Sequence, residues 1–117
     1  MTSNAQVPPV PSIVIEPREW EELAAILLAN LPGRRVWVFG SRAKGRRVRR
    51  FSDLDLAVEG EGITLRDAAL LDEALDESRL PFKVDIVQLT TLTPEFRARI
   101  EPEMVLVQEP ASPEKVA

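Results

Sequence analysis

The chain has 117 residues, 44% of them hydrophobic, which is enough for one compact core and too little for two ordinary domains. It contains no Cys, which excludes a disulfide framework, a Cys-ligated zinc and a thiol nucleophile. It also contains no His and no Tyr, so general-base chemistry near neutral pH falls to a carboxylate or a lysine. Nothing near Met1 resembles a signal peptide, and no apolar run is long enough to span a bilayer. We expect a cytoplasmic protein without membrane contact.

The formal net charge of −4 is spread unevenly along the chain. Six basic residues fall within one short stretch, namely Arg42, Lys44, Arg46, Arg47, Arg49 and Arg50. A basic island on an acidic body suggests a local site for phosphate or for an acidic partner. The low isoelectric point, about 4.9, argues against general coating of nucleic acid, and we expect no direct nucleic-acid binding.

The first half of the chain predicts a helix followed by two strands. Residues 1–12 are polar and rich in proline, as are residues 110–117, and we expect disordered tails around one domain at 13–109. A helix is expected from Pro17, ended by Gly33. Its apolar residues recur at helical spacing: Trp20, Leu23, Leu27 and Leu31. Residues 36–39 form a buried strand, 40–52 a basic loop that opens with a helical turn, and 53–58 an alternating strand.

The second half predicts a helix, a strand, a short helix and a last strand. Thr64 and Asp67 resemble a capping box for a helix that runs to about Ser78. Its inner face would be Ala68, Leu71 and Leu75. Residues 82–89 are a β-branched strand, Thr93 begins a short helix, and 104–107 form the last strand. This order predicts an α/β (α+β) fold in which helices flank a mixed β-sheet.

Three aspartates stand at strand positions. Asp53 and Asp55 alternate with apolar residues, so both carboxylates leave one face of the strand, about 6.5 Å apart along the backbone. Asp85 takes a similar position in the next strand. Such a pair is common on a solvated strand face, but it also suits two Mg²⁺ ions about 4 Å apart, as in phosphoryl transfer. Asp is rare in β-strands, so three aspartates at strand positions flanked by Leu, Val and Ile favour the metal site.

The residues after the first strand suggest a phosphate site. Gly40 would let phosphate oxygens approach backbone N–H groups, and Ser41 adds a hydroxyl donor, although Gly-Ser at a strand end is commonly a turn. Arg42 and Lys44 are as consistent with phosphate contacts as with a solvated loop. For the basic residues from 46 to 50 a solvated loop is the better interpretation unless a partner docks there.

Together these residues resemble the nucleotidyltransferase superfamily of DNA polymerase β, kanamycin nucleotidyltransferase and the poly(A) polymerases. That family's pattern is an apolar residue, Gly-Ser, a spacer, Asp-apolar-Asp-apolar, and a third carboxylate on a later strand. Here it reads Phe39-Gly40-Ser41, then residues 53–56 as Asp-Leu-Asp-Leu, then Asp85. The string FGSRAKGRRVRRFSDLDLAV is similar to the minimal nucleotidyltransferase (MNT) group.

The resemblance implies a polymerase β-like fold and roles for the site residues. Asp53 and Asp55 would bind two Mg²⁺ ions, and Asp85 would bind the catalytic ion and help deprotonate the attacking hydroxyl. Gly40 and Ser41 would hold the triphosphate of ATP. The family often has Arg or Lys in the positions of Arg42 and Lys44. MNT proteins resemble the antitoxin half of a type VII-like module whose toxin is a HEPN ribonuclease, which implies transfer of AMP to a HEPN tyrosine.

Two other functions remain open from the sequence. The domain could block a HEPN toxin by stoichiometric binding, or it could modify a small molecule with an acceptor site borrowed from a dimer mate. The intact aspartates favour the enzyme. The sequence does not identify the nucleotide, the acceptor or the oligomeric state.

Overall fold

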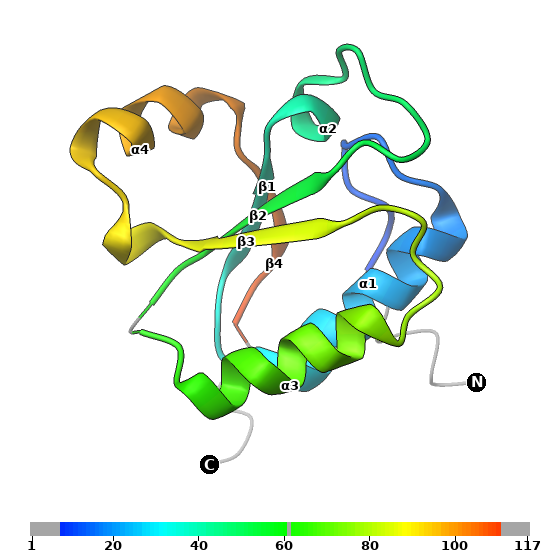
Figure 1. The fold of residues 1–117 in the computed structure, drawn as a ribbon. Helices are drawn as coiled ribbons and strands as arrows, with labels where there is room; N and C mark the ends of the chain where they lie inside the picture. The colour runs from blue at the N-terminus through cyan, green and yellow to red at the C-terminus, as the bar shows by residue number, and fades with distance from the viewer. Residues whose placement is uncertain (1–7, 61, 111–117) are drawn as a thin grey trace.

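The computed structural model describes residues 8–60 and 62–110, and its framework is a four-stranded sheet in the order β3-β2-β1-β4. The elements, in chain order, are α1 (Pro17–Asn30), β1 (Val36–Phe39), α2 (Ser41–Lys44), β2 (Leu54–Val58), α3 (Leu65–Asp76), β3 (Val84–Gln88), the 3-10 turn η2 (Leu89–Thr91), α4 (Pro94–Ile100), the 3-10 turn η3 (Glu101–Glu103) and β4 (Val105–Gln108). Figure 1 shows their arrangement.

The sheet is mixed. β1 pairs antiparallel with both β2 and β4, whereas β2 pairs parallel with β3. The parallel pair requires a crossover, and α3 supplies it. The carboxyl end of β1 therefore lies at the same end of the sheet as the amino ends of β2, β3 and β4.

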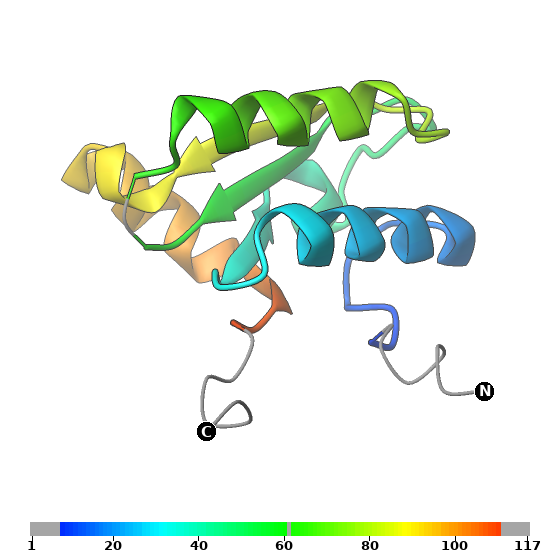
Figure 2. The same ribbon diagram turned by 90° about the horizontal axis from the view of Figure 1, so that it is seen from below.

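Helices α1 and α3 cover one face of the sheet and lie side by side (Figure 2). Pro17 opens α1, and the Thr64 hydroxyl caps α3 by accepting a hydrogen bond of 3.0 Å from the Asp67 N–H. The core beneath the two helices includes Trp20, Leu23, Leu27, Leu54, Leu56 and Leu71. Leu54 and Leu56 are fully buried there, as their alternation with the aspartates predicts.

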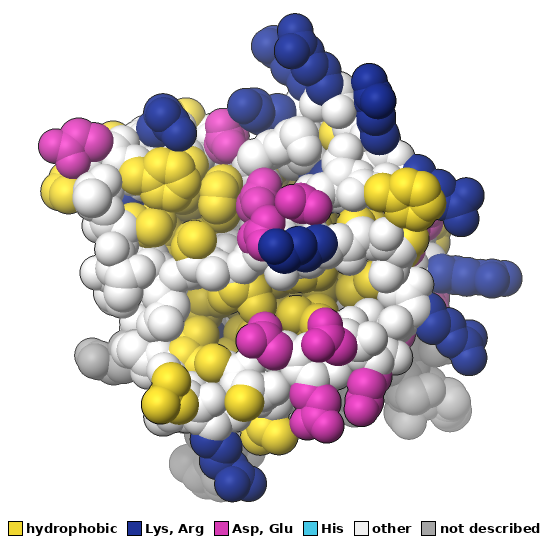
Figure 3. Space-filling view, viewed as in Figure 1, with side chains coloured by type: hydrophobic (Ala, Val, Ile, Leu, Met, Phe, Trp, Pro, Cys, Tyr) yellow, Lys and Arg dark blue, Asp and Glu magenta, His cyan; other side chains and the backbone are white. Residues whose placement is uncertain are grey.

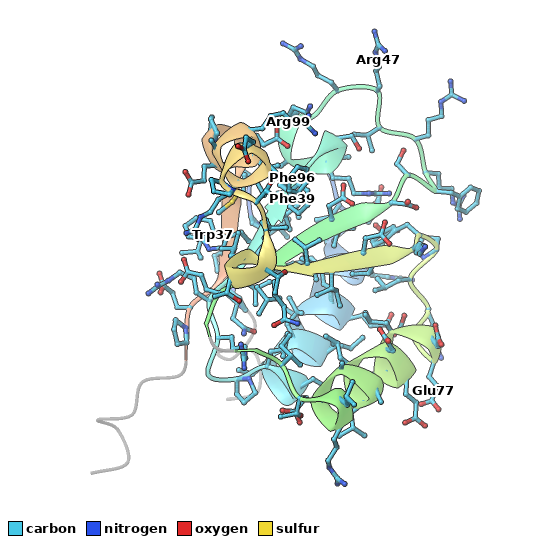
Figure 4. The ribbon with its side chains drawn as sticks, turned by 60° about the vertical axis from the view of Figure 1, so that its left-hand side comes forward. Trp37, Phe39, Arg47, Glu77, Phe96 and Arg99 are labelled. Atoms are coloured by element: carbon cyan, nitrogen blue, oxygen red, sulfur yellow. The ribbon has the colours of Figure 1, made fainter. Side chains whose placement is uncertain are left out.

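A smaller cluster occupies the opposite face at one end of the sheet. Phe39, Ala57, Leu89 and Ile100 are its buried members. Phe96 of α4 meets Phe39 edge to face at 6.2 Å between ring centroids, with Trp37 alongside in Figure 4. Asp55 shares this face, because residues two apart on a strand point the same way and Ala57 belongs to the cluster.

The sequence-based predictions of the elements and of the mixed sheet are confirmed, with small differences at the ends. Helix α1 ends at Asn30 with Leu31 as its C-cap, ahead of Gly33, and β2 begins at Leu54, one residue after Asp53. The predicted tails lie largely outside the described residues. Residues 8–12 are described, and the Pro8 carbonyl accepts a hydrogen bond of 2.8 Å from the Trp20 indole. No helix within 8–60 or 62–110 is long and apolar enough to cross a membrane.

Candidate active site at one end of the sheet

The strand register brings the candidate site residues together. Phe39 is the partner of Asp55 across β1 and β2, and Asp55 is the partner of Asp85 across β2 and β3. Gly40 directly follows Phe39, so it lies beside Asp55, the central carboxylate of the three. The prediction that Asp85 stands on a strand next to that of Asp53 and Asp55 agrees with this register.

Asp55 and Asp53 differ in burial. Asp55 is half-buried, whereas Asp53 is exposed. Burial raises the pKa of Asp55 above its usual range, and repulsion from Asp85, Asp53 and Glu103 raises it further. Anionic groups thus share a small region in which any cation would be stabilised.

The carboxylates do not form a closed set of metal ligands in this arrangement. Within residues 8–60 and 62–110, no three acidic side chains converge as ligands of one ion. Asp85 Oδ1 instead lies 3.5 Å from the exposed Lys83 Nζ, two residues earlier on the same face. The hard oxygen donors suit Mg²⁺ in kind, and the repulsion that raises the pKa of Asp55 is what a divalent ion would offset.

Gly40 occupies a backbone conformation that other residues rarely adopt, with φ 82° and ψ −158°. A Cβ atom at this position would lie well inside van der Waals contact with Asp55 Oδ2. The glycine therefore allows the central carboxylate to lie directly against the backbone. This use of Gly40 is additional to the phosphate contact expected from the sequence.

The Gly40 N–H already has an anionic partner, which the sequence did not predict. It donates a hydrogen bond of 2.7 Å to Glu103 Oε2, and Glu103 Oε1 lies 3.7 Å from Lys44 Nζ. The Glu103 side chain is only 21% exposed. A carboxylate thus takes two of the contacts that the sequence assigns to phosphate, those of Gly40 and Lys44.

The Arg42 side chain is not placed to contact phosphate, as the sequence suggested it could. Its side chain is 3% exposed, and the guanidinium lies 4.1 Å from the centroid of the Phe82 ring. The guanidinium donates hydrogen bonds to four backbone carbonyls, those of Val14, Arg49, Arg50 and Ser52. Burial lowers the pKa of Arg42, whose ordinary value is nevertheless high enough to keep the group charged. Arg42 therefore anchors the basic loop, and Lys44, half-exposed, is the cation beside Gly40.

The anchored loop, residues 45–52, presents basic side chains to solvent. Arg46, Arg47, Arg49 and Arg50 are all exposed, and Arg47 points away from the body at the tip of the loop in Figure 4. Phe51 is 65% exposed, with the Arg50 guanidinium 5.5 Å from its ring centroid. In Figure 3, basic side chains gather around this loop, while an acidic cluster lies over the end of the sheet.

Comparison with known proteins identifies this arrangement. The family model described as "Polymerase beta, Nucleotidyltransferase" matches residues 21–111. The chain belongs to the polymerase β nucleotidyltransferase family. The match covers β1, the Gly40-Ser41 turn and all three aspartates, and the chain is therefore a nucleotidyltransferase.

Two similar proteins extend the comparison. The nucleotidyltransferase is 38% identical over 112 residues to the "Probable protein adenylyltransferase MntA" of Haemophilus influenzae, covering 93% of this chain and 90% of that protein. A solved structure titled "Crystal structure of the toxin-antitoxin with AMP-PNP" superposes with a TM-score of 0.60 at 22% identity, covering 80% of this chain and 74% of that one. The second likeness shows the shared fold.

Sequence reasoning missed Glu103 and the anchoring role of Arg42. An isolated Glu beside a short helix carries no local signal, because the antiparallel pairing of β1 with β4 alone brings it to Gly40. Arg42 has no local signal of burial either, since its partners come from residues 14 and 49–52. Lys83 was detectable, because it stands two residues before Asp85 and must share its face.

Proposed function

We propose that this nucleotidyltransferase transfers AMP from ATP to a partner protein and acts as the antitoxin of a two-protein module. The observation that carries the proposal is the 38% identity, over nearly the whole chain, to a protein named as a probable protein adenylyltransferase. The solved structure titled as a toxin-antitoxin with AMP-PNP supports an adenine nucleotide as donor and a toxin as partner. We propose the cytoplasm as the compartment, where ATP is available.

The acceptor that we propose is a tyrosine of a HEPN-domain toxin. The chain has no Tyr of its own, so a modified tyrosine must belong to another molecule. In the reaction the tyrosine oxygen bonds to the α-phosphorus of ATP, the bond from that phosphorus to the bridging oxygen of the β-phosphate breaks, and pyrophosphate leaves. The acceptor must lie about 3–3.5 Å from the α-phosphorus, a placement that a docked protein surface can hold.

The site residues then take distinct roles. Asp53 and Asp55 would hold two Mg²⁺ ions, and Asp85 would hold the catalytic one of the two. The ions would neutralise the phosphates and make the acceptor hydroxyl more acidic. Asp85 would also help remove the hydroxyl proton, since the chain contains no His. The Gly40 N–H, the Ser41 hydroxyl and Lys44 would contact the triphosphate. Arg42 would act indirectly, by fixing the loop.

The basic loop is the partner surface that we propose. Arg42 donates hydrogen bonds to three carbonyls of this loop, so the loop loses less conformational entropy on binding than a free loop would. Exposed arginines around an exposed aromatic ring are typical of protein interfaces. The acidic remainder of the chain disfavours a polyanionic nucleic acid and leaves an acidic protein surface as the matching partner.

The proposal is tested by mass spectrometry of both proteins. The chain is mixed with a HEPN-domain protein as the proposed partner, ATP and Mg²⁺, and we expect adenylyl groups on a partner tyrosine and none on this chain. Asp53→Asn is the inactive control. If the partner is silenced without being modified, and the Asp53→Asn variant silences it equally well, the domain is instead a stoichiometric blocker.

A further inference from the structure

Glu103 contacts two groups of the proposed triphosphate site, the Gly40 backbone and the Lys44 side chain. Its Oε2 accepts the Gly40 N–H at 2.7 Å, and its Oε1 lies 3.7 Å from Lys44 Nζ. The first distance is that of a strong, charge-assisted hydrogen bond. The carboxylate therefore binds the same donors that a phosphate oxygen would use.

The two anions compete directly for these donors. A backbone N–H carries one hydrogen, and the Gly40 N–H cannot form short hydrogen bonds with Glu103 and with a phosphate together. The Asp55 carboxylate lies on the side of Gly40 where a Cβ would project, so it limits movement of the Gly40 backbone toward that side. Binding of a triphosphate here consequently requires Glu103 to move away.

The fold places Glu103 at this point. β4 pairs antiparallel with β1, so the residues just before Val105 lie beside the end of β1. Glu103 ends the short turn η3, which follows α4, and the Met104 N–H donates a hydrogen bond of 3.3 Å to the Glu101 carbonyl across this turn. The Glu103 side chain is 21% exposed, so it is partly open to solvent.

We infer that Glu103 is a built-in competitor of the nucleotide, which occupies the phosphate contacts of Gly40 and Lys44 in the free protein and lowers the affinity for nucleoside triphosphate. The inference rests on the proposed position of the triphosphate. It assigns a role to a residue outside the Gly-Ser and aspartate pattern.

The test measures binding rather than transfer. Calorimetry with Mg²⁺·ATP and with Mg²⁺·triphosphate compares the full chain with Glu103→Gln, which keeps the shape but removes the charge, and with Glu103→Ala, which removes the acceptor. We expect Kd for both ligands to fall, by about tenfold in Glu103→Ala and by less in Glu103→Gln, whose amide oxygen still accepts from Gly40. Glu101→Gln is the control, because it removes an equal charge from the same turn while Glu101 pairs with Arg97 outside the site. We expect its Kd to stay within about twofold of the parent chain.

Unchanged or weaker binding in both Glu103 variants would overturn the inference, as would an equal gain in Glu101→Gln. If Glu103→Ala fails to fold, Glu103→Gln still decides the question. Absence of binding to the parent chain and to both variants at millimolar nucleotide would overturn the inference together with the nucleotide site. Tighter binding in the variants, without adenylyl transfer to any partner, would leave the inference standing and count against the proposed acceptor.

Discussion

At the scale of single residues, Asp55 and Asp53 differ in burial, and their amide variants should separate activity from stability. We expect Asp55→Asn and Asp53→Asn each to lower the transfer rate by more than about 100-fold, as loss of a charge that stabilises the transition state does. The metal-free fold should persist in both. Asp55→Asn should melt higher than the parent chain at neutral pH, and Asp53→Asn, whose carboxylate is exposed, should change the melting temperature less.

The pH dependence of this stability has a defined sign. Because the pKa of Asp55 is raised in the folded protein, the folded state favours the protonated carboxyl, and stability is lost as the pH rises through the folded pKa. The melting advantage of Asp55→Asn should therefore shrink as the pH falls toward the ordinary aspartate value of 3.8. An advantage that grows on acidification, or unfolding of both variants at neutral pH, would show that these carboxylates hold the fold together.

Gly40 permits a second test at this scale. Gly40→Ala places a Cβ against Asp55 Oδ2 and forces a backbone conformation that is almost restricted to glycine. We expect a loss of about 1–3 kcal/mol in the free energy of unfolding, measured by urea titration, together with lower activity. Gly33→Ala is the matched control, because a Cβ there meets nothing within 4 Å. Equal losses in the two variants would mean that the contact with Asp55 has no special cost.

At the scale of elements, the buried Arg42 should control the order of the basic loop. Arg42→Met keeps an unbranched apolar side chain against Phe82 but removes every donor to the four carbonyls. We expect it to lower the free energy of unfolding by at least about 2 kcal/mol and to speed trypsin cleavage after the loop arginines. Arg46→Met, which removes an exposed arginine from the same loop, should stay within about 0.5 kcal/mol of the parent chain. Unchanged proteolysis in Arg42→Met would contradict the anchoring role.

The elements were largely predictable from the sequence, and the contacts between them were not. Alternation in residues 53–58 and the Thr64 and Thr93 caps indicate local structure, because each depends on neighbours within four residues. The partners of Arg42 and Glu103 depend on pairing between distant segments, which leaves no local pattern. The strand positions of the aspartates accordingly followed from alternation, whereas the contacts of Arg42 and Lys44 did not follow from any local pattern.

For the whole molecule, the clustered negative charge predicts that nucleotide binding depends on a divalent ion. We expect the Kd for ATP to be roughly tenfold or more higher in EDTA than in excess Mg²⁺, since each like-charge contact near 4 Å costs on the order of 1 kcal/mol or more. Calorimetry on the isolated chain measures both values. Equal affinity under the two conditions would count against a metal site at Asp53, Asp55 and Asp85.

The uneven charge of the molecule should also govern the association with the proposed HEPN-domain partner. Charge reversal at Arg46, Arg47, Arg49 and Arg50 should lower the association rate constant by at least about tenfold, and added salt should lower that of the parent chain. Surface plasmon resonance against the HEPN-domain protein measures both effects. The control compares two double variants that change the net charge equally. In one, Arg46 and Arg47 of the loop are reversed, and in the other, the exposed Arg66 and Arg79 outside the loop are reversed. An equal decrease in the two double variants would indicate a general effect of net charge without a docking surface.

The pairing of β1 with β4 also sets the order in which this sheet is completed during synthesis. β4 leaves the ribosome after the other three strands of the sheet, so the edge of β1 stays open while those strands and both covering helices are already available to fold. The Gly40 N–H gains its Glu103 partner only after those elements have been synthesised. A nascent or truncated chain that stops before Glu103 consequently lacks both the fourth strand and the residue that we infer restrains nucleotide binding, and its open strand edge is exposed to pairing with other chains.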